Sequence, residues 1–497
     1  MQLKRREILK GSLLGAGMTV GLTEAFAKSA SPKADADIPS ESFDVVVVGA
    51  GMAGMCAALE AAEKGANVVL LEKCSRPDGV SVYSTGWITA VGSKVQQHHP
   101  EDTKEDLVRD MMRVSRNEAK LELMQVYADE VADGVNWLME KGVSFRVWEN
   151  LPAPELSRCV MPTDDGIPGG AALLRHLYKA LKAAKVPVHC NTNAIELIVT
   201  PNNEVEGVSC LTPEGRKNYL AKGGVILTTG GYASNTAMTG AWIGPWANNL
   251  KMRATPWNVG DNITMGMQVR AKLVHLDQFH AGPITPTGHV NPSTLMHSGY
   301  GIQVNSEGKR FLRENLLQVP KAIAIAKGTI DNLSFILVGS DADASDNILT
   351  RTIERFSLVG YKIAKGNTIA EVAKAAGVPP KALEQTVKEF NAAVKAGKAK
   401  ELNPPYLFET PHALEKGPFY MLPGAGGISN TWGGPQIDVN ANVVNWEDKP
   451  VPGLYAAGCA AGGVWVHDDI GGNQLGGCMV FGRLAARHAT SRAKARG

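Results

Sequence analysis

Residues 44–54 read DVVVVGAGMAG, and this stretch decides the fold. The run Asp44 to Val48 is rich in β-branched residues, as in a strand buried on both faces. Residues Met52 to Lys64 have the apolar spacing of a helix, and Val68 to Leu71 read as a second strand. We therefore predict a strand–helix–strand unit with parallel strands.

The glycines of this stretch form a GxGxxG motif where the strand ends and the helix begins. Gly49 allows the tight turn, Gly51 lets the backbone approach a pyrophosphate, and Gly54 lets the helix pack closely on the strand. The helix N-terminus favours an anion at the same place. Glu72, eighteen residues after Gly54, is placed to bind a ribose hydroxyl. The unit predicts a dinucleotide site but does not by itself distinguish NAD from FAD.

The N-terminus reads as an export signal. Residues 1–27 contain a basic start, a weakly apolar segment and a small-residue cleavage site, and Arg5-Arg6 resembles the twin-arginine signal of proteins exported in folded form. An ordinary secretory signal is the alternative. Residues 28–42 read as a linker, and the expected location is the periplasm.

Charge and composition exclude several classes of protein. Residues 1–27 contain four of the 51 basic and two of the 49 acidic side chains, so their removal leaves 47 of each. A chain with no excess of positive charge is not expected to bind nucleic acid. The seven cysteines are scattered without metal-binding or haem-binding spacing, so we expect no metal site. Beyond the signal, no segment is apolar enough for stable membrane insertion.

Later segments favour FAD over NAD. Residues 228–231 (TTGG) and 453–458 (GLYAAG) resemble the second and third cofactor contacts of FAD enzymes. Further matches are Gly260-Asp261, the GKRF at 308–311 and the GGN at 471–473. Together they resemble the flavoprotein family of fumarate reductases, succinate dehydrogenases and 3-ketosteroid dehydrogenases.

The resemblance implies an α/β fold in which a Rossmann-like FAD-binding domain carries an inserted α+β capping domain. The FAD domain would comprise residues 43–278 and 431–490, and the cap residues 279–430, where the sequence changes to Pro-rich loops and short amphipathic helices. Segment 78–90 contains no histidine, so we expect non-covalent FAD. The FAD-contacting positions that the resemblance implies are Gly49, Ala50, Gly51, Met52, Ala53, Gly54, Glu72, Lys73, Thr85, Gly86, Thr229, Gly230, Asp261, Gly458, Cys459, Asn473, Gln474 and Leu475.

The family's substrate-binding residues are largely replaced. Gln318 stands where the fumarate reductases have a proton-donating arginine, Asp469 where they have a carboxylate-clamping arginine, and Asn430 where they have a histidine. Ser293-Thr294 replaces a Thr-Glu pair, while His280 keeps the family's place. Because a dicarboxylate needs those cationic contacts, we expect that fumarate and succinate are not the substrates. Tyrosines of the ketosteroid branch are missing at 318 and 469 as well.

Hydride transfer to an activated alkene leaves an enolate-like charge, which requires an electrophile and a proton donor. The candidates are His280, Tyr300, His467 and Asp469, and for each a packing or capping role is the alternative. We expect Arg310 and Glu314 to be structural partners.

The predicted function is reduction of a C=C bond in an unsaturated mono-acid, an enone or a related small molecule. The reverse, dehydrogenase-like reaction and a flavin electron carrier without its own substrate remain alternatives. Since the chain has no haem motif, electrons would come from a separate cytochrome or quinol-linked protein.

Overall fold

The computed structural model describes residues 38–99, 101–148, 157–163, 169–287, 299–344 and 347–497. The expected signal peptide and most of the expected linker lie outside these ranges. The first strand begins at Ser40, so the last residues assigned to the linker are part of the fold.

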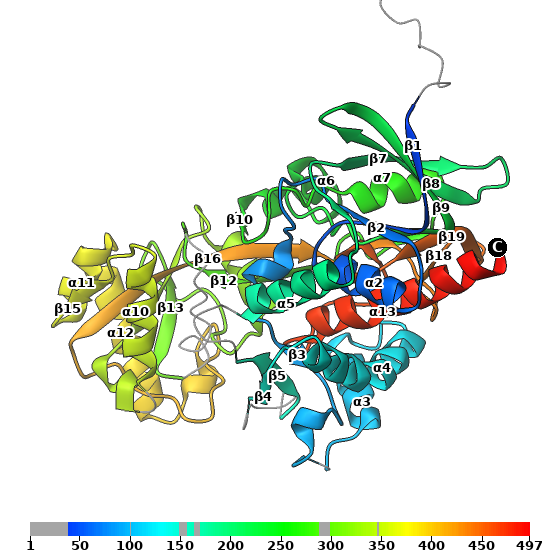
Figure 1. Cartoon of the computed structure of the whole chain (residues 1–497). Helices are drawn as coiled ribbons and strands as arrows, with labels where there is room; N and C mark the ends of the chain where they lie inside the picture. The colour runs from blue at the N-terminus through cyan, green and yellow to red at the C-terminus, as the bar shows by residue number, and fades with distance from the viewer. Residues whose placement is uncertain (1–37, 100, 149–156, 164–168, 288–298, 345–346) are drawn as a thin grey trace, which may run out of the picture.

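A sheet of eight strands carries the nucleotide-binding half (Figure 1). Its path runs β18-β19-β9-β1-β2-β6, and β8 joins β7 to β9. The strands are β1 (Ser40–Val48), β2 (Val68–Leu71), β6 (Val188–His189), β7 (Asn193–Val199), β8 (Val205–Thr212), β9 (Gly215–Leu227), β18 (Asn442–Val444) and β19 (Pro450–Ala456). Strand β1 lies between β2 and β9 in parallel register, with Val45 opposite both Val68 and Gly224. The predicted strand–helix–strand unit is therefore confirmed.

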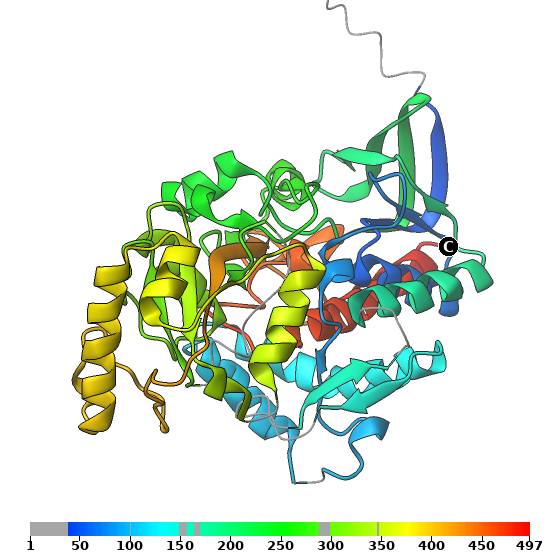
Figure 2. The ribbon, with the colours of Figure 1, turned by 90° about the vertical axis from the view of Figure 1, so that its left-hand side faces the viewer.

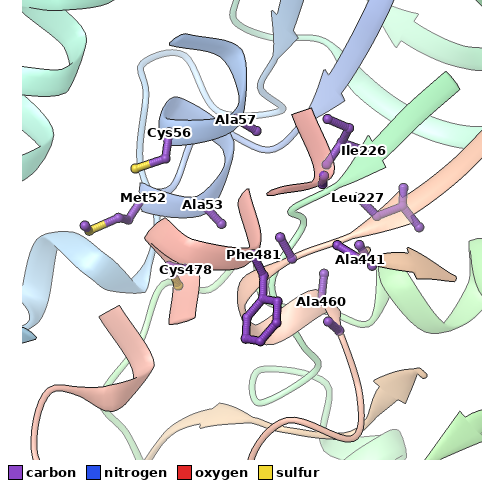
Figure 3. Close-up of a cluster of buried hydrophobic side chains, with 14 of the residues drawn as sticks. Met52, Ala53, Cys56, Ala57, Ile226, Leu227, Ala441, Ala460, Cys478 and Phe481 are labelled. Carbon is purple, nitrogen blue, oxygen red and sulfur yellow. The ribbon is translucent and has the colours of Figure 1, made fainter. Parts of the chain in front are cut away.

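The helices of this half pack against the sheet and against one another. They are α2 (Met52–Glu63), α3 (Lys104–Val114), α4 (Leu121–Glu140), α5 (Gly169–Ala183), α6 (Thr236–Trp242), α7 (Asp261–Gln268) and α13 (Asn473–Ala495). Helix α2 lies beside α5 and the long α13 (Figure 2). Figure 3 shows side chains of α2, β9 and α13 meeting in one buried cluster, with Phe481 among them. This burial holds the end of β1 and the start of α2 in place.

The second half is built on a sheet of six strands flanked by helices. Its elements are β10 (Lys251–Met252), β12 (Phe279–Ile284), β13 (Gly301–Asn305), β14 (Ser334–Val338), β15 (Ala364–Gly366), β16 (Phe419–Thr431), α9 (Gln318–Gly328), α10 (Ile348–Leu358), α11 (Ile369–Ala376) and α12 (Pro380–Lys395). Two smaller sheets are formed by β11 (Leu273–Val274) with β17 (Gly434–Pro435), and by β3 (Ile88–Thr89), β4 (Phe145–Val147) and β5 (Cys159–Pro162). Short 3-10 turns are η2 (Val80–Tyr83), η3 (Lys94–Gln96), η4 (Pro245–Asn249), η5 (Ser340–Ala344), η6 (Ala399–Glu401) and η7 (Gly458–Ala460).

Strand β16 joins the two halves. Figure 1 shows it in orange, running from the cap towards the nucleotide-binding half. Its first residues pair with β15 and β14, and its last residues pair with β12 on one side and β10 on the other. The sequence boundary at 430/431 falls inside this strand, and β10 belongs to the cap sheet although it precedes residue 279. Residues on both sides of the expected 430/431 boundary therefore belong to the six-stranded sheet.

Candidate active site

The glycine-rich turn opens a cleft of about 820 Å³ at the carboxyl ends of β1 and β9. Predicted FAD-contacting residues that line it are Gly49, Ala50, Gly51, Met52, Ala53, Glu72, Lys73, Thr229, Gly230, Asp261, Gly458 and Cys459. In open α/β sheets, ligands bind at this end of the strands. The cleft thus lies where a dinucleotide is expected.

Two glycines of the turn face different surroundings. A Cβ on Gly54 would come within 1.8 Å of the Gly49 carbonyl oxygen and 2.6 Å of Thr228 Oγ1, so this position is filled by the protein itself. A Cβ on Gly51 would find only the carbonyl oxygen of Asp78, at 4.0 Å. The space beside Gly51 therefore belongs to the cleft, at the N-terminus of α2.

Glu72 is tied to the turn by two backbone hydrogen bonds. Ala50 N donates to Glu72 Oε2 and Cys74 N donates to Glu72 Oε1, both at 2.8 Å. Lys73 forms an ion pair of 2.5 Å with Asp261 at the same cleft. These contacts fix the carboxylate while leaving it at the cleft wall, where a ribose hydroxyl can reach it.

The residues present fit FAD. The side chain of Asn258 is buried at the cleft wall, and neither its amide oxygen nor its amide nitrogen has a partner among the described residues. Sequence reasoning missed Asn258, because an asparagine in a loop carries no spacing signal. A ligand with hydroxyl and amide groups would satisfy it, since buried polar groups are normally hydrogen-bonded.

Some predicted contacts lie outside the cleft lining. Thr85 and Gly86 pack against Gly169 at the start of α5. Asn473, Gln474 and Leu475 form the first turn of α13, and the Asn473 amide is buried without a partner among the described residues.

Two of the substituted positions, Asn430 and Asp469, belong to one chain of polar side chains. Asn430 Nδ2 donates to Gln474 Oε1 at 2.6 Å and contacts Cys459 Sγ at 2.8 Å. Gln474 Nε2 donates to Asp469 Oδ2 at 2.8 Å. Asn430 and Asp469, both predicted substrate-site residues, are thus linked through Gln474, and Cys459 connects the chain to the cleft.

His280 lies next to this chain, on β12. Its Nδ1 is 3.3 Å from Ser429 Oγ, and its Nε2 is 3.9 Å from Asp469 Oδ1, beyond hydrogen-bond distance. Burial, together with the positive charge of Arg253, lowers the pKa of His280 to about 3. The imidazole is therefore neutral at pH 7 and can donate only through the nitrogen that carries its single proton.

Gln318 begins α9, which packs against β12. Its Oε1 is 3.0 Å from the position that a Cβ on Gly282 would take, and Arg253 Nη1 is 3.2 Å from the same point. Sequence reasoning missed Arg253, which has no motif and is brought here by the pairing of β10 with β16.

Tyr300 and His467, the two remaining candidate proton donors, contact residues outside the polar chain of Asn430, Gln474 and Asp469. The Tyr300 ring stacks on His412 within the cap, with centroids 4.0 Å apart. His467 Nε2 lies 3.0 Å from Glu118 Oε2, and the His467 N–H donates to Gln278 Oε1. His280, Asp469 and Asn430 are brought together, whereas Tyr300 stacks inside the cap.

Arg310 and Glu314 are structural partners, as expected. They form a buried pair with hydrogen bonds of 2.8 and 2.7 Å, and the guanidinium lies over the rings of Phe390 and Tyr406. Ser293-Thr294 lies outside the described residues.

Within the described ranges, no cluster of three or more His, Cys, Asp or Glu side chains could hold a metal. Among the described helices, none combines the length and apolar character needed to cross a bilayer.

Comparison with known proteins agrees with this geometry. The family model described as an FAD binding domain matches residues 44–475. A probable fumarate reductase of Shewanella frigidimarina is 30% identical over 467 residues, covering 93% of this chain and 77% of the relative. The acrylate reductase flavoprotein subunit of Shewanella woodyi is 27% identical and covers 98% of both chains.

Among solved structures, the open conformation of a flavocytochrome c3 fumarate reductase superposes with a TM-score of 0.80 at 28% identity, covering 96% of this chain and 81% of that one. The predicted fold class and cofactor are confirmed. The chain belongs to the FAD-binding domain family and is an FAD-dependent oxidoreductase.

Proposed function

We propose that the chain is an exported reductase of an activated C=C bond, acting on a small molecule with at most one carboxylate. The relatives named above include an acrylate reductase that matches over the full length and a probable fumarate reductase. The choice between a monocarboxylate and a dicarboxylate rests on the charges of the candidate site.

The polar chain of Asn430, Gln474 and Asp469 carries this choice. Where the family resemblance implies cationic anchors, Gln318 and Asp469 offer an amide and a carboxylate. Asp469 and the Nδ2 of Asn430 are both already hydrogen-bonded to Gln474. Each charge-assisted hydrogen bond that a dicarboxylate loses costs roughly 1.5–3 kcal/mol, and Asp469 adds repulsion.

The chemistry needs a hydride, a polarised acceptor and a proton. When bound in its reduced form, FAD would supply the hydride. The neutral imidazole of His280 is placed to donate a hydrogen bond to the substrate, and Asp469 limits the charge that the substrate can carry next to it. Tyr300 stays a candidate for proton transfer on the same proposal, since loops of the cap can approach the site when a substrate binds. His467, in the FAD domain, stays a candidate as well.

The proposal includes non-covalent FAD, a separate electron donor and export by the twin-arginine route. Arg5-Arg6 supports folded export, which suits a protein that takes up its cofactor before crossing the membrane. The electron donor would be a cytochrome or a quinol-linked protein.

A substrate panel tests the proposal directly. The oxidation rate of a reduced dye is measured with fumarate, acrylate, cinnamate and neutral enones. We expect kcat/KM for fumarate to be at least about a thousandfold below that of the best monocarboxylate or enone. His280→Ala should lower the rate with the best substrate, and Tyr300→Phe tests the cap tyrosine. Fumarate turnover equal to that of the best alternative would contradict the proposal.

A further inference from the structure

Arg253 is a half-buried cation beside β12. It follows β10 directly, and its backbone N–H donates to the Ile428 carbonyl oxygen of β16 at 2.8 Å. Its Nη1 is buried, and among the described residues it has no hydrogen-bond partner. No carboxylate of the described residues forms an ion pair with it.

A buried unpaired charge is costly, so such an arginine requires a reason. Burial lowers the pKa of the Arg253 guanidinium, which reports the same loss of solvation. An arginine nevertheless keeps its proton in proteins. The chain therefore maintains a positive charge here that its own described residues do not neutralise.

The guanidinium lies close to β12 and to the start of α9. Gly282 on β12 faces Arg253 Nη1 and Gln318 Oε1, and any side chain at 282 would have its Cβ within 3.2 Å of both atoms. Arg253 also acts electrostatically on His280. Arg253, Gln318 and His280 thus surround one stretch of β12.

Residues that closely follow Arg253 in the chain line the FAD cleft. Thr255, Trp257 and Asn258 line that cleft and follow Arg253 within five residues. On the opposite side, Cys459 lines the cleft and contacts Asn430. A small molecule bound near Arg253 would therefore lie at the border of the cofactor site.

We propose that Arg253 is the specificity-determining anchor of the substrate, binding its single carboxylate, so that the substrate class is an α,β-unsaturated monocarboxylate. The inference rests on the proposed function and selects one substrate class within it. A guanidinium binds a planar carboxylate through two parallel hydrogen bonds. A neutral enone would leave the charge of Arg253 uncompensated, and a second carboxylate would face Asp469 without a cation.

The same contact would assist the reaction. When the β-carbon receives a hydride, negative charge moves onto the carboxylate oxygens, and a proton must then be added at the α-carbon. The fixed charge of Arg253 stabilises those oxygens and needs no proton transfer of its own. Arg253 is therefore expected to influence both substrate binding and turnover.

The test uses the FAD-loaded enzyme and the variants Arg253→Gln and Arg253→Lys. Propanoate and 3-phenylpropanoate, which cannot be reduced, serve as binding probes read by changes in flavin absorption. Arg253→Gln should raise the Kd of both acids at least about tenfold, and Arg253→Lys should raise it less. With cinnamate and methyl cinnamate as substrates, the preference for the acid over the ester should disappear in Arg253→Gln.

Lys251→Gln is the matched control, because Lys251 is an exposed cation two residues away on β10. It should leave the Kd values and the acid-over-ester ratio unchanged. If Arg253→Gln fails to fold, Gly282→Ala tests the same place. Its Cβ would press on Arg253 Nη1 and Gln318 Oε1, which lie at the ends of flexible side chains, and should raise the Kd of both acids.

The outcomes separate the inference from the proposed function. Unchanged Kd values and an unchanged acid-over-ester ratio in the folded variants would refute the role of Arg253, while the wild-type enzyme could still reduce cinnamate or an enone. A wild-type enzyme that reduces none of the panel would instead refute the proposed function.

Discussion

Gly54 leaves no room for a side chain, because its Cβ would lie 1.8 Å from the carbonyl oxygen of Gly49. Gly54→Ala should therefore damage the fold itself, by forcing α2 away from β1. Gly51→Val should instead fold and lose FAD, since its side chain would enter the cleft and not the protein. FAD content from absorption and the melting temperature of the apoprotein distinguish the two effects. Full FAD content in Gly51→Val would contradict the assignment of the cleft.

Local patterns in the sequence were sufficient to predict the nucleotide-binding unit. The valine run and the glycine spacing each depend on neighbouring residues, and the structure has the strand and the helix where they were expected. Such short-range signals are set by strand and helix periodicity.

The substrate region could be predicted only in part, because distant pairings build it. Asn430 and Asp469 were singled out as substituted positions, but their link through Gln474 depends on how α13 meets β16. Arg253 reaches Gln318 only because β10 and β12 both pair with β16. A single sequence contains no local signal for such pairings.

FAD should be released by acid precipitation. Segment 78–90 has no histidine to form a covalent bond. Burial raises the pKa of the Cys459 thiol to about 11 and that of Cys74 to about 12, so the cleft offers no thiolate near neutral pH. The supernatant should be yellow and contain FAD, as chromatography against FAD and FMN standards would show. Flavin that stays in the pellet would mean a covalent bond.

Export should depend on the paired arginines. Changing Arg5-Arg6 to Lys-Lys should leave the precursor in the cytoplasm with FAD bound, because twin-arginine signals are read by a receptor. Cell fractionation with an FAD assay measures this, and Lys4→Arg is the control that keeps both arginines. Normal export of the Lys-Lys variant would refute the twin-arginine interpretation.

Gln474 should stabilise the site by joining Asn430 to Asp469. Gln474→Ala removes one acceptor and one donor, and we expect the free energy of unfolding to fall by roughly 1–3 kcal/mol. Gln385→Ala is the control, because Gln385 makes one hydrogen bond to Glu389 on the exposed surface of α12. This substitution should lower the free energy of unfolding by less than about 0.5 kcal/mol. Thermal unfolding of the FAD-loaded proteins compares them. An equal fall in stability in both variants would show that the hydrogen bonds of Gln474 to Asn430 and Asp469 add no stability.

His280 should make the protein sensitive to acid. Its pKa is lowered to about 3 in the folded protein, against an ordinary value of 6.5. Between these values the unfolded chain binds a proton that the folded protein does not, so stability rises with pH across this window and is lost as pH falls below about 6.5.

The contribution reaches at most about 1.4 kcal/mol per pH unit. Unfolding by urea at several pH values from 4.5 to 6.5 measures the slope. His280→Gln should flatten it, whereas His98→Gln, at an exposed position, should leave it unchanged. The neutral imidazole also predicts that kcat/KM has no inflection near pH 6.5 due to His280. An inflection near pH 6.5 that His280→Gln removes would contradict this prediction. It would show that the imidazole becomes charged in the folded enzyme, because Asp469 raises its pKa by more than burial and Arg253 lower it.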